Sequence, residues 1–162
     1  MKNEILTMKR FCIDEQYEIC NPVWNHYYDR EEKAYNFWLR IESDKAITQS
    51  EDTAYIFQAL NWEINVVEKS LREEDIRTGF KYFIPDGYDE TRGGWITNFY
   101  FCEHMGTDKN HIEIIDTDGD SLLVRLSGEI PDVNFYDDSK ANTKLLLEAW
   151  FRRDGDSYRS MC

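Results

Sequence analysis

Apolar residues recur at every second position in several segments of the chain, which is the period of a strand with one buried face. Residues 33–42 place four apolar side chains on one face: Tyr35, Phe37, Leu39 and Ile41. Residues 80–84 alternate in the same way before Pro85 stops the run, and residues 95–104 are aromatic enough for burial on both faces. We therefore expect all three segments to be strands of one antiparallel system.

A turn between two apolar runs predicts a β-hairpin near the middle of the second half of the chain. The runs are residues 111–115 and 122–130, and the sequence Asp116-Thr-Asp-Gly-Asp-Ser121 separates them. The turn needs a residue that accepts a positive φ, which Gly119 supplies at little cost. These residues predict two antiparallel neighbours joined at the Asp-Gly step.

Two further segments carry a helical and an alternating pattern at once. In residues 53–71 the apolar positions fit a helical stripe behind a capping box at Thr48-Gln-Ser-Glu51, yet residues 60–66 also alternate. In residues 143–153 charged side chains would pair at helical spacing, yet the leucines, Ala149 and Phe151 would also share one face of a strand. Because their neighbours are strands, we predict strands in both segments, with a helix in either as the alternative.

Short strands joined by turns of Gly, Asp and Asn favour a mostly β fold, an antiparallel β-sandwich or an open barrel, with room for one or two short helices. An α+β sheet is the alternative. No linker or repeat interrupts residues 1–162, so we expect a single globular domain, and the three prolines, Pro22, Pro85 and Pro131, stand at apparent turns. Strands do not alternate with long helices, and neither GxGxxG nor a P-loop occurs, which argues against a nucleotide-binding parallel sheet.

Charge narrows the range of partners. The chain has 32 Asp and Glu against 19 Lys and Arg, for a formal net charge of −13, while aromatics make up 15% of its residues. Those aromatics indicate a folded acidic domain and not a disordered acidic tail. The negative charge repels phosphates and anionic lipid headgroups, so we expect neither nucleic acid nor a membrane surface as a partner. A basic protein is the partner that the charge favours.

The N-terminal residues and the cysteines point to a reducing compartment. Charged residues break up every short apolar stretch of MKNEILTMKRFCIDEQ, so we expect no signal peptide and a cytoplasmic location. The four cysteines, Cys12, Cys20, Cys102 and Cys162, include no CxxC pair. We therefore expect free thiols and not disulfides.

Two residue clusters suggest chemistry at first sight. Asp116, Asp118 and Asp120 have the spacing of the first half of an EF-hand, but the glycine falls at the fourth position and Ser127 stands at the twelfth, which excludes that site. Cys102 and His104 would leave the same face of a strand and His111 could join them, but zinc requires a fourth ligand. We expect no metal, no cofactor and no assigned catalytic residue. A Cys–His nucleophile remains an alternative.

Two stretches that mix acids with aromatics are the candidate partner-binding loops. Exposed Tyr beside Asp suits Lys or Arg of a partner, because the ring offers cation–π attraction and the carboxylate accepts charge-assisted hydrogen bonds. The alternative is that Tyr88, Phe135 and Tyr136 turn inward to close the ends of the sheet. The candidate residues are Asp86, Tyr88, Asp89 and Glu90 in the first stretch and Asp132, Asn134, Tyr136, Asp137 and Asp138 in the second.

These features favour binding over catalysis. We expect a non-enzymatic acidic protein, of the inhibitor or immunity type known from bacteria, that covers a basic protein partner; opposite charge accelerates such association. Two alternatives remain open. One is a β module that binds a small ligand or a carbohydrate, and the other is an enzyme centred on the Cys and His residues.

Overall fold

The described part of the protein is mostly β-structure. The computed structural model describes residues 4–135 and 138–155. Besides a short helix α1 (Glu51–Ile56) and a 3-10 turn η1 (Glu73–Asp75), its elements are the strands β1 (Ile5–Lys9), β2 (Asp14–Asp29), β3 (Ala34–Thr48), β4 (Leu60–Glu68), β5 (Lys81–Ile84), β6 (Tyr88–Asp89), β7 (Gly94–Trp95), β8 (Thr97–Phe101), β9 (Glu103–Met105), β10 (Asp108–Asp118), β11 (Ser121–Ile130) and β12 (Thr143–Arg153). The mostly β prediction is confirmed.

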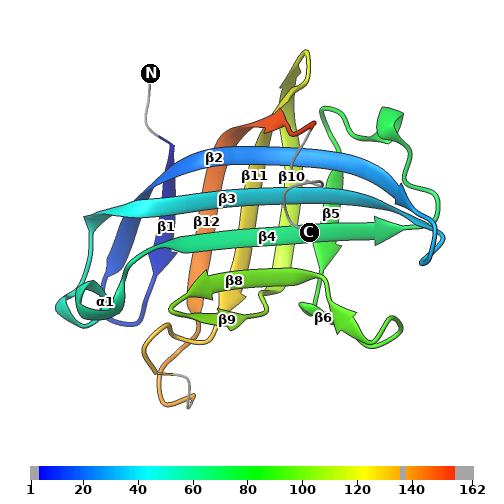
Figure 1. Cartoon of the computed structure of the whole chain (residues 1–162). Coiled ribbons are helices and arrows are strands. Elements are labelled where there is room, and N and C mark those ends of the chain that lie inside the picture. Colours follow the sequence, from blue (N-terminus) through cyan, green and yellow to red (C-terminus); the bar gives the residue numbers. More distant parts are fainter. Residues whose placement is uncertain (1–3, 136–137, 156–162) are drawn as a thin grey trace.

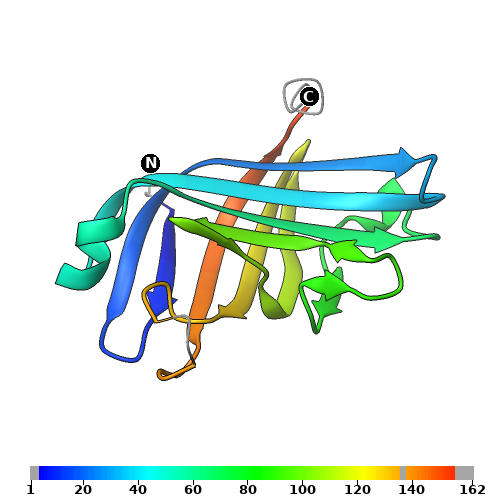
Figure 2. The same cartoon turned by 60° about the horizontal axis from the view of Figure 1, so that its bottom comes forward.

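Ten of the strands form one strongly curled sheet, in the order β5-β10-β11-β12-β1-β2-β3-β4-β8-β9, and β6 pairs with β7 beside it. The pairing is antiparallel except for a short parallel contact between the end of β12 and the interior of β2, at Val23 and Trp24. Figures 1 and 2 show that β2, β3 and β4 cross over β10, β11 and β12, so that the two halves of the sheet face each other. The result is a half-barrel, which confirms the open-barrel prediction.

A bulge in β2 helps the sheet to curl. Asn21 has a φ of 51°, and the register with β3 shifts on both sides of Cys20. Bulges of this kind bend a strand and increase its twist. Pro22 therefore lies inside a long strand at an irregularity, and its placement at a turn was wrong.

The predicted hairpin is present. β10 and β11 pair from Asp118–Ser121 at the turn toward Asp108–Glu129, and Gly119 has the expected positive φ of 57°. The segment at residues 143–153 is the strand β12, as predicted, and it pairs with β11 from Thr143 to Arg152.

Residues 53–71 contain the end of a helix and a strand, so each of the two patterns seen in the sequence holds for part of this segment. Residues up to Ile56 belong to α1, so the strand prediction was wrong there, while β4 follows the alternating pattern from Leu60. The residue before the helix is Ser50 and not Thr48, and its side chain bonds to Glu15 and Asp52 instead of capping the helix. The helix ends at Ile56, and the alternating apolar side chains of β4, which begins at Leu60, are buried in the core.

Residues 95–104 are buried on one face only, which corrects the expectation of burial on both. β8 alternates buried and half-buried side chains, with Phe99 and Phe101 inside. Trp95 is 66% exposed because it belongs to the separate β6–β7 hairpin and not to the large sheet.

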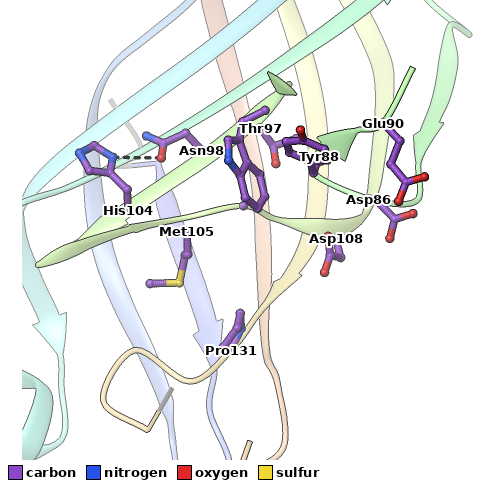
Figure 3. A pocket seen from close by; sticks show the side chains of 11 residues that line it. Asp86, Tyr88, Glu90, Thr97, Asn98, His104, Met105, Asp108 and Pro131 are labelled. Carbon is purple, nitrogen blue, oxygen red and sulfur yellow. Dashed lines mark hydrogen bonds between the residues drawn. The ribbon is translucent and has the colours of Figure 1, made fainter. Parts of the chain in front are cut away.

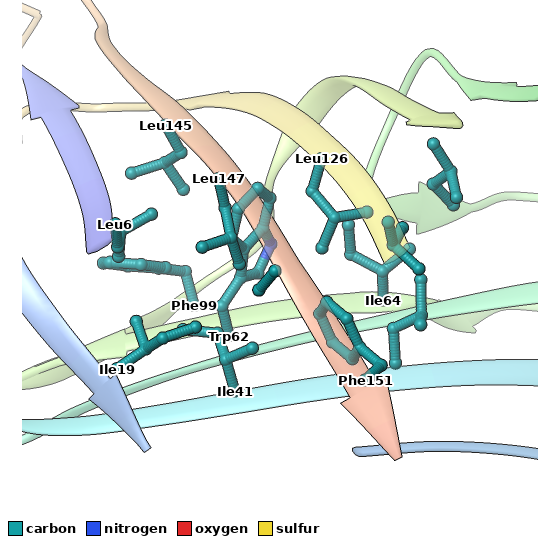
Figure 4. Close-up of a cluster of buried hydrophobic side chains, with 14 of the residues drawn as sticks. Leu6, Ile19, Ile41, Trp62, Ile64, Phe99, Leu126, Leu145, Leu147 and Phe151 are labelled. Atoms are coloured by element: carbon teal, nitrogen blue, oxygen red, sulfur yellow. The ribbon is translucent and has the colours of Figure 1, made fainter. Parts of the chain in front are cut away.

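The core fills the concave side of the sheet. Figure 4 shows aliphatic side chains of β11 and β12 packed against aromatic residues of β4 and β8, including Trp62 and Phe99, whose rings lie 6.4 Å apart. Aromatic rings bury large areas, which suits a core formed between two strongly curved halves. Among the described residues, no helix has the length and apolar character needed to span a membrane.

Candidate functional site

A groove at one end of the half-barrel is lined by three of the four candidate residues of the first predicted loop: Asp86, Tyr88 and Glu90. It has a volume of about 630 Å³ and lies between the β6–β7 hairpin, β8–β9 and the end of β11 (Figure 3). The residues that line it are Asp86, Tyr88, Glu90, Trp95, Thr97, Asn98, His104, Met105, Gly106, Asp108 and Pro131. We call this the acidic groove.

The segment leading into the hairpin is anchored by close backbone packing at Gly87. A Cβ atom at this position would lie 2.3 Å from Thr97 Oγ1 and 2.8 Å from the Thr107 carbonyl oxygen, so only glycine fits. The Gly87 amide donates to Asp108 Oδ1 at 3.0 Å, and its carbonyl accepts from the Ile96 amide at 2.8 Å. These contacts hold the backbone between Asp86 and Tyr88, two residues that line the groove.

Asp89 shapes the hairpin turn. Its carboxylate accepts hydrogen bonds from the Thr91 amide and hydroxyl, at 3.0 and 2.6 Å, and from the Arg92 amide. The pKa of the Asp89 carboxyl lies below its usual range, chiefly because the Thr91 hydroxyl donates to it. The two backbone amides and the charge of Arg92 lower this pKa further. Gly93, with a φ of 69°, completes the turn. The carboxylate of Asp89 is thus already engaged, and its role is to hold its neighbours in place.

Two exposed rings lie in the groove. Trp95 is 66% exposed and Tyr88 is 42% exposed, and their ring centroids lie 5.2 Å apart at an interplanar angle of 75°. Tyr88 is therefore exposed, as expected for a partner-binding residue, and does not turn inward to close the sheet. Trp95 is a residue that the sequence interpretation missed, because its aromatic neighbours along the chain suggested a buried strand.

Three carboxylates of the groove have no basic partner among the described residues. In the part of the chain that the structure describes, Asp86, Glu90 and Asp108 form no ion pair. The nearby basic side chains are engaged elsewhere: Arg92 pairs with Asp89 and Glu32, and Lys109 pairs with Glu129 at 3.2 Å. Within residues 4–135 and 138–155, the groove therefore carries uncompensated negative charge beside exposed aromatic surface.

A depression on the outer face of the sheet provides a contrast. It has a volume of about 500 Å³ and lies over β1, β10, β11 and β12. Its acidic residues Glu113 and Glu148 are both paired with Arg125, at 3.3 and 2.9 Å. Negative charge is compensated there and uncompensated in the acidic groove.

In the second predicted loop, Asp132 and Asn134 bond to other residues of the protein and do not line the acidic groove. Asp132 is 1% exposed and binds the buried Arg10, whose Nε and Nη2 donate to its two carboxylate oxygens at 2.8 and 2.9 Å. Asn134 donates to Asp52 at 3.1 Å, and Asp138 is exposed with a φ of 59°. Tyr136 and Asp137 lie outside the described residues. Asp132 is thus unavailable to a partner, since it holds the loop to the core.

Arg10 is the centre of a buried polar cluster. It also donates to Asp52 at 3.0 and 2.8 Å and lies 3.5 Å from Glu15. The pKa of Arg10 is raised: burial alone lowers it, but the hydrogen bonds to Asp52 and Asp132 and the nearby carboxylates outweigh that effect. The cluster joins the β1–β2 turn, α1 and the loop after β11, so we assign it a structural role.

The cysteine and histidine residues do not assemble into one site. Cys102 is exposed at a φ of 66°, His104 bonds through Nδ1 to Asn98 Oδ1 at 3.0 Å, and His111 packs on Phe83 with centroids 4.7 Å apart. Within residues 4–135 and 138–155, no three His, Cys, Asp or Glu side chains are placed to hold a metal ion. Cys12 and Cys20 are exposed free thiols, and Cys162 lies outside the described residues.

Comparisons with protein-family models, curated proteins and solved structures find no match for this chain.

Proposed function

We propose that the protein is a non-enzymatic binding protein, of the inhibitor or immunity type, whose acidic groove covers a basic surface of a cytoplasmic protein partner. The proposal is supported by three carboxylates that form no ion pair with any described residue, Asp86, Glu90 and Asp108, beside the exposed rings of Tyr88 and Trp95. Lys and Arg would supply the missing counter-charges.

The charge of the whole chain supports the same proposal. A net charge of −13 attracts a basic protein over several ångströms beyond contact and raises the rate of encounter. The same charge opposes binding to nucleic acid or to an anionic membrane surface. The aromatic rings then add contact area at the centre of the interface, where tyrosine and tryptophan contribute most.

One observation also favours carbohydrate binding as a second candidate. Trp95 exposes a flat ring beside the amide of Asn98, an arrangement suited to stacking on a sugar and bonding its hydroxyls. A neutral sugar would leave the three carboxylates without counter-charges, which is why we place this function second.

Affinity capture at two salt concentrations tests the proposal. The tagged protein is incubated with a lysate of its native cell at low salt, washed, and then eluted at high salt, and the eluted proteins are identified by mass spectrometry. We expect one basic protein that salt releases, since salt screens attraction between exposed charges. Capture of no basic protein, or a complex unaffected by salt, would contradict the proposal, and retention on a sugar resin at high salt would favour the second candidate.

A further inference from the structure

We infer that the partner inserts an arginine side chain into the acidic groove, with its guanidinium group against Trp95 and within reach of the carboxylates of Asp86, Glu90 and Asp108. This inference rests on the proposed function and specifies the chemistry of its contact. The inference follows from the side chains that line the groove together. Trp95 and Glu90 belong to the β6–β7 hairpin, Asp86 precedes it and Asp108 begins β10.

The indole of Trp95 is held in place although it is exposed. Gly106 packs against its six-membered ring so closely that a Cβ atom there would lie 2.2 Å from Cζ3, and Tyr88 contacts it nearly at a right angle. Most of the ring nevertheless remains open to solvent in the groove. A fixed, exposed indole is the best aromatic acceptor for a cation.

The acids of the groove come from different segments of the chain: Asp86 precedes β6, Glu90 follows β6 and Asp108 begins β10. Figure 3 shows Asp86 and Glu90 beside the hairpin and Asp108 below them, with Tyr88 between these acids and His104. Trp95 lines the same groove and contacts Tyr88. One oxygen of Asp108 accepts the Gly87 amide, which leaves its second oxygen for a ligand. Several acceptor oxygens lining one groove with an exposed ring suit a group that presents several donors at once.

A guanidinium group satisfies this arrangement better than an ammonium group. It is planar, stacks on aromatic rings and presents five N–H donors in a fixed fork, whereas an ammonium group is a compact and strongly hydrated charge. The groove is also preorganised, because Gly87 and Asp89 fix the hairpin through backbone and side-chain contacts. Preorganisation reduces the entropy that binding costs.

Two peptides of equal charge test the inference directly. The affinities of tetra-arginine and tetra-lysine peptides for the full chain are measured by calorimetry at one fixed ionic strength. The comparison is repeated with Trp95→Ala and with Trp150→Ala, which removes a second exposed tryptophan, 39% exposed, on β12. We expect the arginine peptide to bind about tenfold more tightly, the preference to disappear in Trp95→Ala, and Trp150→Ala to behave as the wild type.

The outcomes separate this inference from the proposed function. Equal affinities for the two peptides, or an unchanged preference in Trp95→Ala, would overturn the arginine contact and leave the acidic groove as a general site for basic proteins. Failure of the wild type to bind either peptide at low salt would contradict both. Because Trp95 is mostly exposed, its replacement leaves the folded core intact, and a circular dichroism spectrum verifies this.

Discussion

Gly106 and Trp95 are packed so closely that position 106 has no room for a side chain: a Cβ atom there would lie 2.2 Å from Cζ3 of the indole. The glycine therefore sets the position of the main aromatic surface in the acidic groove. A neighbouring glycine, Gly94, has nothing within 4 Å of the equivalent position. The two glycines make a matched pair for testing the groove without changing its charge.

Gly106→Ala should displace Trp95 and weaken binding of a basic ligand about tenfold, because the added methyl group and the ring cannot occupy the same space. Tryptophan fluorescence measures the displacement, and the spectrum of Trp95→Phe identifies the part of the signal that comes from Trp95. Calorimetry with the arginine peptide measures the affinity. Gly94→Ala is the control and should leave both unchanged. Equal affinity in Gly106→Ala and the wild type would show that the position of the ring does not matter.

Arg10 should be among the residues most important for stability, although it is polar. Replacing it with methionine leaves the buried carboxylates of Glu15 and Asp132 without their cation, and we expect a loss of about 3–5 kcal/mol in the free energy of unfolding. Urea denaturation measures this loss. Arg77→Met, at an exposed arginine without an ion pair in the described part, should change stability by less than about 0.5 kcal/mol. A similar small change in Arg10→Met would contradict the structural role of the cluster.

The same cluster should make the protein sensitive to acid. The hydrogen bonds from Arg10 hold the pKa of the Asp52 carboxyl well below its usual range, against the opposing effect of burial. A lowered pKa means that this contribution to stability is complete above the unfolded value, about pH 4, and is lost as the pH falls further. The urea midpoint of the wild type should therefore fall more steeply between pH 5 and pH 2 than that of Asp52→Asn. Parallel pH profiles would show that Asp52 does not contribute.

Asp89 should determine how rigid the hairpin is. Asp89→Ala removes the acceptor for the Thr91 and Arg92 amides, and we expect hydrogen exchange at these two amides to accelerate about fivefold to tenfold. Exchange is followed by NMR. Asp118→Ala, at the exposed tip of the β10–β11 hairpin, should leave both amides unaffected. Unchanged exchange in Asp89→Ala would mean that the backbone alone holds the turn.

The sequence pattern predicts those parts of the fold in which local signals agree. The β10–β11 hairpin follows from alternation and from Gly119, and the inner face of β3 follows from its alternating apolar residues. The curl of the sheet was not predictable in the same way, because it depends on the irregularity at Asn21 and Pro22 and on which strands pair across long distances. Pro22 indicated a turn, so the sequence pattern did not predict the long strand β2 that contains it.

The candidate site was predictable only in part. Asp86, Tyr88 and Glu90 follow from the local mixture of acids and aromatics, and they line the acidic groove as a group. Asp132 has the same local signal but is buried by Arg10, which is 122 positions away in the chain. Trp95 and Asp108 join the groove through tertiary contacts with Gly106 and Gly87, and no local pattern marks such contacts.

The most direct test of the account compares two double variants with the same change of charge. The first, Asp86→Asn with Glu90→Gln, neutralises the acidic groove, and the second, Asp118→Asn with Glu31→Gln, neutralises two exposed acids elsewhere. The affinity of the salt-released basic partner for each is measured by calorimetry. The account predicts a loss of about tenfold or more for the groove variant and little change for the other. An equal loss in both variants would show that the partner responds to net charge alone and would contradict the acidic groove as its binding site.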